Sequence, residues 1–495
     1  MKFAAASRFA CLVLPLWLAA CGGGDSSPAP AAPAPAPVPL PAPTPPPLPP
    51  VDMQAPTAAL TAPLDLASGL TGMLILSATA SDNVGVTGVE FQVDGVPVGA
   101  TATTAPYAAS VDTTLYASGQ HVVRARATDA NGNLSPWAVA TVAFGGTRTQ
   151  PTGFTRNETW VSGLNGATAM AQAPDGRLFV AQQGGALRVV KNGALLATPF
   201  MQLTVDAGGE RGLIGVTTHP NFGANGYVYV YYTSTEGGSH NRISRFTANG
   251  DVVLAGSEVK LVDLPNLSSA TNHNGGALHF GADAKLYAGV GDNANRAQAP
   301  DLASVFGKML RLNDDGSIPN DNPFYATSTG QARAVWASGL RNPYTFAVQP
   351  GTGRIHINDV GENTWEEVNL GAAGANYGWP NSEGAAGVAA GHVAPIFSYK
   401  HSMATPPGSG EGGFFTGFAI AGGSFYPASG PFPSAFRGNY FFADFVSRFI
   451  ARFDLANNAV YAFGNVSGSP VDMLSGADGA LYVLTRDSIA RFSAP

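Results

Sequence analysis

Charged residues and cysteines are both scarce in this chain of 495 residues. Lys, Arg, Asp and Glu make up 12% of it, the formal net charge is −7, and no basic stripe is visible. Because nucleic-acid binding needs clustered positive charge, the sequence argues against a nucleic-acid partner. Convincing helical periodicity is missing outside short pieces, whereas glycine and short β-branched or aromatic runs are abundant. This combination predicts an all-β protein.

The two cysteines, Cys11 and Cys21, both lie in the N-terminal segment. Lys2 and Arg8 precede a short apolar run, and the small residues before Cys21 form a secretory cleavage pattern. Residues 1–20 are therefore predicted to be a signal peptide. The segment resembles a bacterial lipoprotein box with Cys21 as the lipidated residue. An ordinary signal peptide with an incidental cysteine is the alternative.

The lipoprotein interpretation predicts a location. Two or more acyl chains give stable membrane anchoring, and Gly22 stands where aspartate usually retains lipoproteins at the inner membrane. We therefore expect a lipid-anchored protein of the cell envelope, at the outer membrane and facing the periplasm. Residues 21–54 are rich in proline and alanine, cannot build a core, and are predicted to be an extended polyproline-II spacer.

Residues 55–146 are predicted to form an immunoglobulin-like β-sandwich. Strand-like runs alternate with turn signals and cover residues 73–78, 86–93, 119–128 and 137–144. The turns at 82–85 and 129–133 are rich in Asp, Asn and Gly, and these segments resemble bacterial Ig-like domains. Glycan or cell-wall adhesion and a simple spacer role both stay open. Calcium binding and ordinary turn chemistry explain the Asp and Asn residues equally well.

Residues 152–495 contain a recurring pattern of a tight Asp/Gly turn followed by an alternating strand. It begins near Asp175, Asp283, Gly351 and Asp478. Internal periodicity of this kind predicts a β-propeller, and blades of roughly 40–60 residues would give about six of them. A propeller binds its ligands with the loops at one mouth of its axial channel.

Four polar loops at strand ends are the candidate site segments. They are residues 208–215, 272–276, 291–295 and 339–343. His273 lies in a turn between two asparagines, where it could act as a general base, and Asp292 is placed to orient it. On the residues alone, a catalytic base and a turn histidine bonded to backbone are equally open. His219, in His-Pro-Asn-Phe, is predicted to be a turn anchor.

Several stretches, in the same order, resemble the soluble glucose/sorbosone and aldose sugar dehydrogenases. They are Leu213–Phe222, Asn272–Leu278, Gly307–Phe324, Gly339–Pro343 and Asn376–Pro380. The resemblance covers nearly all of residues 152–495. It implies a six-bladed propeller that uses pyrroloquinoline quinone (PQQ) and calcium to oxidise a small sugar, passing electrons to a periplasmic acceptor.

The resemblance also implies roles for individual residues. His273 would take the proton of the sugar hydroxyl and Asp292 would hold its tautomer, while Glu210 and Asn272 would contact the sugar. Arg341 and Asn342 would face the quinone oxygens. The carbonyls of Gly361 and Glu362 would bind the cofactor's calcium, and Glu367 and Tyr377 a second, structural calcium.

The chain departs from the better-known members of that family at two places. Glu210 stands where they have glutamine. Residues 469–473 carry no cation where they have two cofactor-binding arginines, and Arg437 is a substitute for another of their cofactor-binding cations. The retained site residues favour a sugar dehydrogenase. The missing cations favour a non-catalytic propeller that, with the Ig-like module, binds glycan or protein.

Overall fold

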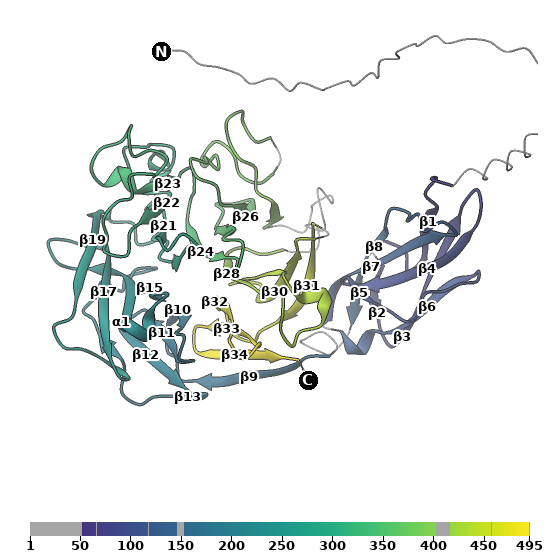
Figure 1. The fold of residues 1–495 in the computed structure, drawn as a ribbon, viewed down its shortest axis with the longest axis horizontal. Helices are drawn as coiled ribbons and strands as arrows, with labels where there is room; N and C mark the ends of the chain where they lie inside the picture. The colour runs from purple at the N-terminus through teal and green to yellow at the C-terminus, as the bar shows by residue number, and fades with distance from the viewer. Residues whose placement is uncertain are drawn as a thin grey trace, which may run out of the picture. The chain divides into compact units, whose positions relative to one another are not determined.

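The computed structural model describes residues 52–145, 153–401 and 416–494, apart from Leu66, Ala117, Ala386 and Asn457. The signal peptide, Cys21 and nearly all of the spacer lie outside these residues, so those expectations stay predictions. Strands dominate the described parts (Figure 1). Among their few helices, none has the length and apolar character needed to cross a bilayer.

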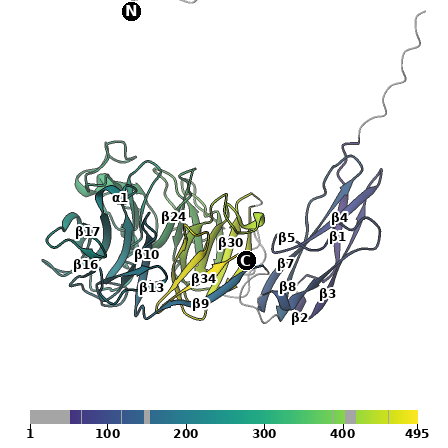
Figure 2. The same ribbon diagram turned by 60° about the horizontal axis from the view of Figure 1, so that its bottom comes forward.

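Residues 52–145 form two β-sheets that share one apolar core (Figure 2). One sheet has the order β1-β3-β6 and the other β2-β8-β7-β4-β5. The strands are β1 (Thr57–Ala62), β2 (Ala67–Leu70), β3 (Met73–Ser81), β4 (Val86–Val93), β5 (Val96–Pro97), β6 (Tyr107–Asp112), β7 (Ser118–Asp129) and β8 (Ala138–Gly145), with the short helix η1 (Thr113–Leu115). The four strand-like runs of the sequence correspond to β3, β4, β7 and β8, so those predictions are confirmed.

From residue 153 onward the chain forms six successive antiparallel sheets, numbered here first to sixth. The first and second contain β10 (Ala167–Gln172), β11 (Leu178–Gln182), β12 (Ala186–Lys191), β13 (Ala194–Leu195) and β14 (Met201–Gln202), then β15 (Leu213–Thr218), β16 (Tyr227–Ser234), β17 (His240–Asn249), β18 (Val252–Val253) and β19 (Val259–Asn266). The third and fourth contain β20 (Leu278–Phe280), β21 (Leu286–Val290), β22 (Lys308–Leu312) and β23 (Val335–Ala337), then β24 (Pro343–Val348), β25 (Ile355–Asp359), β26 (Trp365–Leu370) and β27 (Phe397–Lys400).

The fifth sheet contains β28 (Ile420–Phe425), β29 (Tyr440–Asp444), β30 (Phe449–Asp454) and β31 (Ala459–Asn465). The sixth contains β32 (Pro470–Ser475), β33 (Leu481–Thr485) and β34 (Ser488–Ser493), and its outer strand is β9 (Thr155–Ser162) from the start of this region. Short helices lie in the connections: α1 (Phe222–Asn225), η2 (Arg296–Gln298), η3 (Gly330–Ala334) and η4 (Ser434–Phe436).

The recurring turn of the sequence joins the first and second strands of the first, third, fourth and sixth sheets. Three of these turns contain Asp175, Asp283 or Asp478. In each, the aspartate Oδ1 accepts a hydrogen bond from the backbone N–H of the residue two positions later, at 3.1 Å. Such a side chain stabilises a tight turn locally, which explains why the pattern was visible in the sequence.

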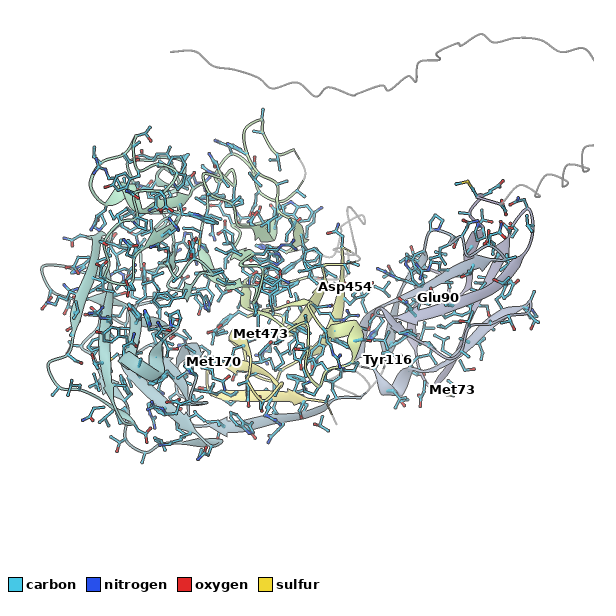
Figure 3. The ribbon with its side chains drawn as sticks, in the orientation of Figure 1. Met73, Glu90, Tyr116, Met170, Asp454 and Met473 are labelled. Atoms are coloured by element: carbon cyan, nitrogen blue, oxygen red, sulfur yellow. The ribbon has the colours of Figure 1, made fainter. Side chains whose placement is uncertain are left out.

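The six sheets form a closed circle. The first strands contact one another in the order β10, β15, β20, β24, β28 and β32, and β32 contacts β10 again. Met170 on β10 and Met473 on β32 mark this junction in Figure 3. An apolar cluster fills the space between each pair of neighbouring sheets, including the sixth and the first. The loops that follow or precede the first strands are therefore brought to a common centre.

Candidate active site

The four polar loops of the sequence meet in the structure. Glu210 N–H donates to the Thr271 carbonyl at 2.9 Å, which joins the first loop to the second. Asp292 N–H donates to the Arg341 carbonyl at 2.8 Å, which joins the third to the fourth. Backbone hydrogen bonds between segments far apart in the sequence thus bring these loops together into one polar site.

His273 and Asp292 form a buried pair at the centre of these loops. The Nδ1 atom of His273 lies 2.7 Å from Asp292 Oδ1, and Asp292 Oδ2 accepts the indole N–H of Trp379 at 2.9 Å. His273 is 8% exposed and Asp292 1%. A carboxylate on Nδ1 holds the proton on that nitrogen and leaves Nε2 as the basic atom. Nε2 makes no hydrogen bond with any described residue.

The backbone around His273 is unusual. His273 has a φ of +57°, in the left-handed region, and Gly275 and Gly276 follow with φ of +64° and +123°. A Cβ on Gly291 would collide with the His273 carbonyl oxygen. Strained backbone of this kind persists where surrounding structure holds it, and it gathers at functional sites. Two loops here approach more closely than side chains allow.

Glu210 supports the His273 loop from the side. Its Oε2 atom accepts the backbone N–H of His273 at 2.7 Å and the Asn342 side-chain amide at 3.5 Å. Asn342 Oδ1 in turn accepts the Gly275 N–H at 3.0 Å. One carboxylate oxygen of Glu210, predicted to contact the sugar, is thus already used to position the loop. Asn272 is partly exposed beside His273.

Arg341 and Asn342 are held by the buried carboxylate of Asp359. Asp359 accepts the Arg341 N–H at 2.9 Å and the Asn342 N–H at 2.7 Å. Burial, with Glu367 nearby, nevertheless raises the pKa of Asp359 well above its ordinary value. The Arg341 guanidinium donates Nη1–H to the Val360 carbonyl at 2.9 Å, while its buried Nε–H has no acceptor among the described residues.

A pocket of about 310 Å³ adjoins the loops that contain Glu210 and Asn342. Glu210 and Asn342 line it, together with the polar side chains of Thr168, Gln183, Tyr344 and Arg486. His273, Asp292 and Arg341 are not among its lining residues. Glu210 and Asn342 therefore form the wall that the pocket shares with the His273 loop.

Arg486 supplies a cation that the sequence reasoning missed. It follows β33 directly. Its backbone N–H donates at 3.2 Å to the carbonyl of Ser469, the first residue of the stretch 469–473 that lacks a cation. Its Nη2–H donates to Gln183 Oε1 at 2.6 Å, which points the guanidinium along the pocket wall. Strand pairing brings Arg486 to this position, and no local motif marks it. Arg437, offered as the substitute cation, does not line the pocket and donates its Nε–H to the Phe432 carbonyl at 2.7 Å.

Buried cations also brace the loops. Arg211 pairs with Asp206 at 2.7 Å and donates to the Ser268 and Ala270 carbonyls, just before the His273 turn. The Lys308 ammonium donates to three backbone carbonyls between residues 298 and 306, all within 2.8 Å. Burial lowers the pKa of Lys308 to about 7. The sequence contains both cations, but nothing near them indicates these long-range partners.

The residues expected to bind calcium lie in and after the fourth sheet. Gly361 has no room for a side chain, because a Cβ would collide with the Trp365 carbonyl. Glu362 N–H donates to Glu383 Oε1 at 2.6 Å. Glu367 is buried and accepts the Gly384 N–H at 2.6 Å, while the Tyr377 hydroxyl donates to the Leu370 carbonyl at 2.8 Å. No contact between the Glu367 and Tyr377 side chains is found among the described residues.

A family model described as Glucose / Sorbosone dehydrogenase matches residues 164–493. The chain belongs to this family. A second model, described as a bacterial Ig domain, matches residues 56–125.

Characterised relatives share the same region. The chain is 30% identical over 345 residues to aldose sugar dehydrogenase YliI of Escherichia coli, which covers 65% of this chain and 87% of that one. It is 34% identical over 254 residues to quinoprotein glucose dehydrogenase B of Acinetobacter calcoaceticus, covering 45% and 52%. The crystal structure of the soluble E. coli aldose sugar dehydrogenase in the apo form superposes with a TM-score of 0.60 at 27% identity, over 69% and 100% of the two chains.

Proposed function

We propose that the chain is a PQQ- and calcium-dependent dehydrogenase that oxidises an aldose or a related sugar alcohol. The observation that carries the proposal is the buried His273–Asp292–Trp379 arrangement beside a pocket lined by a cation. Membership of the glucose/sorbosone dehydrogenase family supports it, as do relatives named as a sugar dehydrogenase and a quinoprotein.

We further infer that the six sheets are the blades of a β-propeller and that residues 55–146 are an Ig-like sandwich. The closed order of first strands and the apolar clusters between neighbouring sheets support the first inference. Two sheets around one core, with a matching bacterial Ig model, support the second. A lipid anchor on Cys21 and a periplasmic electron acceptor complete the proposal.

The pocket fits the anionic cofactor. Its volume lies at the lower end of the range of roughly 300–1,000 Å³ for cofactor sites. PQQ carries three carboxylates, and Arg486 places a positive charge in the pocket wall, where its Nη atoms donate to the Ala167 carbonyl and to Gln183. Arg486 thus supplies a positive charge in the pocket that residues 469–473 do not provide.

The calcium expectation rests on oxygen atoms around Gly361 and Glu367. The carboxylates of Glu367 and Asp359 are buried, and the side-chain oxygen of Asn369 is buried without a donor among the described residues. Oxygen-rich, acidic surroundings suit a hard divalent cation.

The reaction assigns each residue a task. Oxidation of the sugar removes a hydride from carbon and a proton from the hydroxyl group; bound PQQ would supply the hydride acceptor. Nε2 of His273 receives the proton, and Asp292 stabilises the imidazolium that results. Glu210 and Asn342 keep the His273 loop in place, and Arg341 offers positive charge where negative charge develops.

The test adds PQQ and calcium to the purified protein and follows dye reduction over a panel of aldoses and polyols. We expect turnover of at least one sugar, loss of that turnover in His273→Ala, and retained PQQ binding in that variant. His219→Gln is the matched control, because His219 lies in the turn before α1 and does not line the pocket. Absence of both PQQ binding and dye reduction at saturating cofactor would contradict the proposal and leave the non-catalytic alternative.

A further inference from the structure

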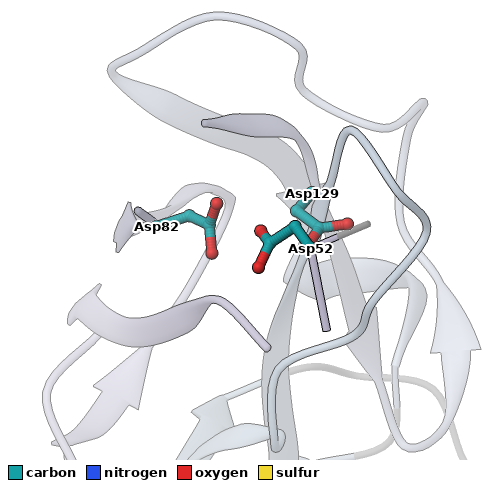
Figure 4. A group of neighbouring side chains, drawn as sticks. All are labelled: Asp52, Asp82 and Asp129. Carbon is teal, nitrogen blue, oxygen red and sulfur yellow. The ribbon is translucent and has the colours of Figure 1, made fainter. Parts of the chain in front are cut away.

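Three aspartates from separate segments meet in residues 52–145. Asp52 precedes β1, Asp82 follows β3, and Asp129 ends β7. Each offers a carboxylate oxygen, and these oxygens lie within 4.8 Å of one another. Figure 4 shows Asp52 between the other two. The sequence indicated turns at Asp82 and Asp129, but Asp52 belonged to the predicted spacer.

Turn chemistry explains only part of this group. Asp82 Oδ2 accepts the N–H groups of Val84 and Gly85 at 2.8 and 2.9 Å. Asp129 Oδ1 accepts the N–H groups of Asn131 and Asn133 in the same way. These bonds are those expected of Asx turns and need no ligand.

Two oxygens are left over. Asp52 Oδ2 and Asp82 Oδ1 are buried, and no described residue donates a hydrogen bond to either. None of the three aspartates forms an ion pair with a described Lys or Arg. Unpaired carboxylate oxygens that are withdrawn from water are costly, and close carboxylates also repel one another. A cation between them removes both penalties.

We propose that Asp52, Asp82 and Asp129 bind a calcium ion. Calcium takes oxygen ligands at roughly 2.3–2.6 Å, so oxygens that share one ion lie at most about 5 Å apart. The three aspartates meet this limit, because their ligand oxygens all lie within 4.8 Å of one another. An all-oxygen set without His or Cys is unsuited to zinc. None of the three residues offers a nitrogen or sulfur ligand.

The site ties the start of the domain to two of its loops. The side-chain amides of Asn131 and Asn133 donate to the Asp52 carbonyl at 3.1 and 3.0 Å, which places the chain before β1 against the loop after β7. Asp52 stands at the end of the Pro/Ala-rich segment. A bound ion would therefore fasten the point where that segment joins the folded domain. This inference does not depend on the proposed enzyme activity.

The experiment counts bound calcium in the full chain. Wild type, Asp82→Asn and Asp52→Asn, all stripped with chelator, are dialysed against calcium chloride and bound metal is measured. We expect each variant to bind one calcium ion fewer than wild type. The matched control, Asp112→Asn, removes a carboxylate that caps η1 in the same domain, outside the group of three aspartates, and should bind the wild-type number.

A second measurement separates loss of the site from loss of the fold. Asp52 lies outside every strand, so Asp52→Asn should keep the wild-type melting temperature in chelator. Added calcium should then raise the melting temperature of the Ig-like region in wild type by several degrees and leave the variant unchanged. Equal calcium content in wild type and both variants would overturn the proposal, whatever the result with PQQ.

Discussion

At the scale of single residues, Asp292 is the side chain on which the candidate site depends. One of its oxygens bonds to His273 Nδ1 and the other accepts the Trp379 indole N–H, so the carboxylate group is held in one orientation. The predicted pairing of Asp292 with His273 is thus present in the structure. Trp379 was visible only within a stretch resembling the family, and its bond to Asp292 could not be inferred from spacing because 87 residues separate them.

Asp292→Asn should lower turnover sharply. An amide in this position no longer stabilises the imidazolium and can reverse the tautomer of His273, which costs about 10²- to 10⁴-fold in comparable acid–base sites. The measurement is kcat for dye reduction with the reconstituted protein, beside PQQ affinity, which should change little. Trp379→Phe removes one donor to Asp292 and should have a smaller effect. Wild-type kcat in Asp292→Asn would refute the assigned role.

At the scale of elements, β25 contains a buried histidine whose pairing a sequence cannot reveal. His356 has no exposed surface, and neither ring nitrogen has a hydrogen-bond partner among the described residues. Its ring packs against Phe425 and Tyr440, each with centroids 4.7 Å away. Burial, assisted by Arg354, lowers the pKa of His356 to about 3. All of β25 is buried, so His356 is enclosed together with both of its neighbours on the strand, which the alternation of the sequence does not indicate.

His356 should make the stability depend on pH. Its folded pKa lies below its ordinary value, so the unfolded chain binds the proton first, and stability is lost as pH falls from about 6.5 towards 3. At pH 5 the loss from this residue is about 2 kcal/mol relative to neutral pH. Denaturant unfolding of wild type and His356→Phe at pH 7.5 and 5 measures it. The variant should lose less stability between the two pH values; equal losses would contradict the assignment.

At the scale of the whole molecule, closure of the circle decides where the site residues stand. β9 comes from the start of the region and pairs with β34 at its end. Val161 on β9 packs in the apolar cluster shared by the first and sixth sheets. The backbone N–H and hydroxyl of Ser467 both donate hydrogen bonds to Glu158 on β9, which adds polar contacts at this junction. Pairs of residues about 300 positions apart hold this junction.

Removing β9 should therefore disrupt the whole region rather than one sheet. A chain that begins at residue 163 exposes the edge of β34 and opens the apolar cluster of Val161. We expect it to lose cooperative thermal unfolding, whereas a chain that begins at residue 153 should keep it. Calorimetry of the two purified chains makes the comparison. Matching transitions would show that the circle does not need β9.

The sequence by itself determined the all-β class, the positions of the principal strands and turns, and the four polar loops, two of which contain His273 and Asp292. These features are local, because side-chain alternation and turn chemistry act over a few residues. Only the tertiary structure decided that Arg486 lines the pocket while Arg437 does not, that Glu210 braces the backbone of His273, and that Asp52 joins Asp82 and Asp129. Each of these depends on which distant segments ring closure and sheet packing bring within hydrogen-bonding distance, and no local pattern encodes that.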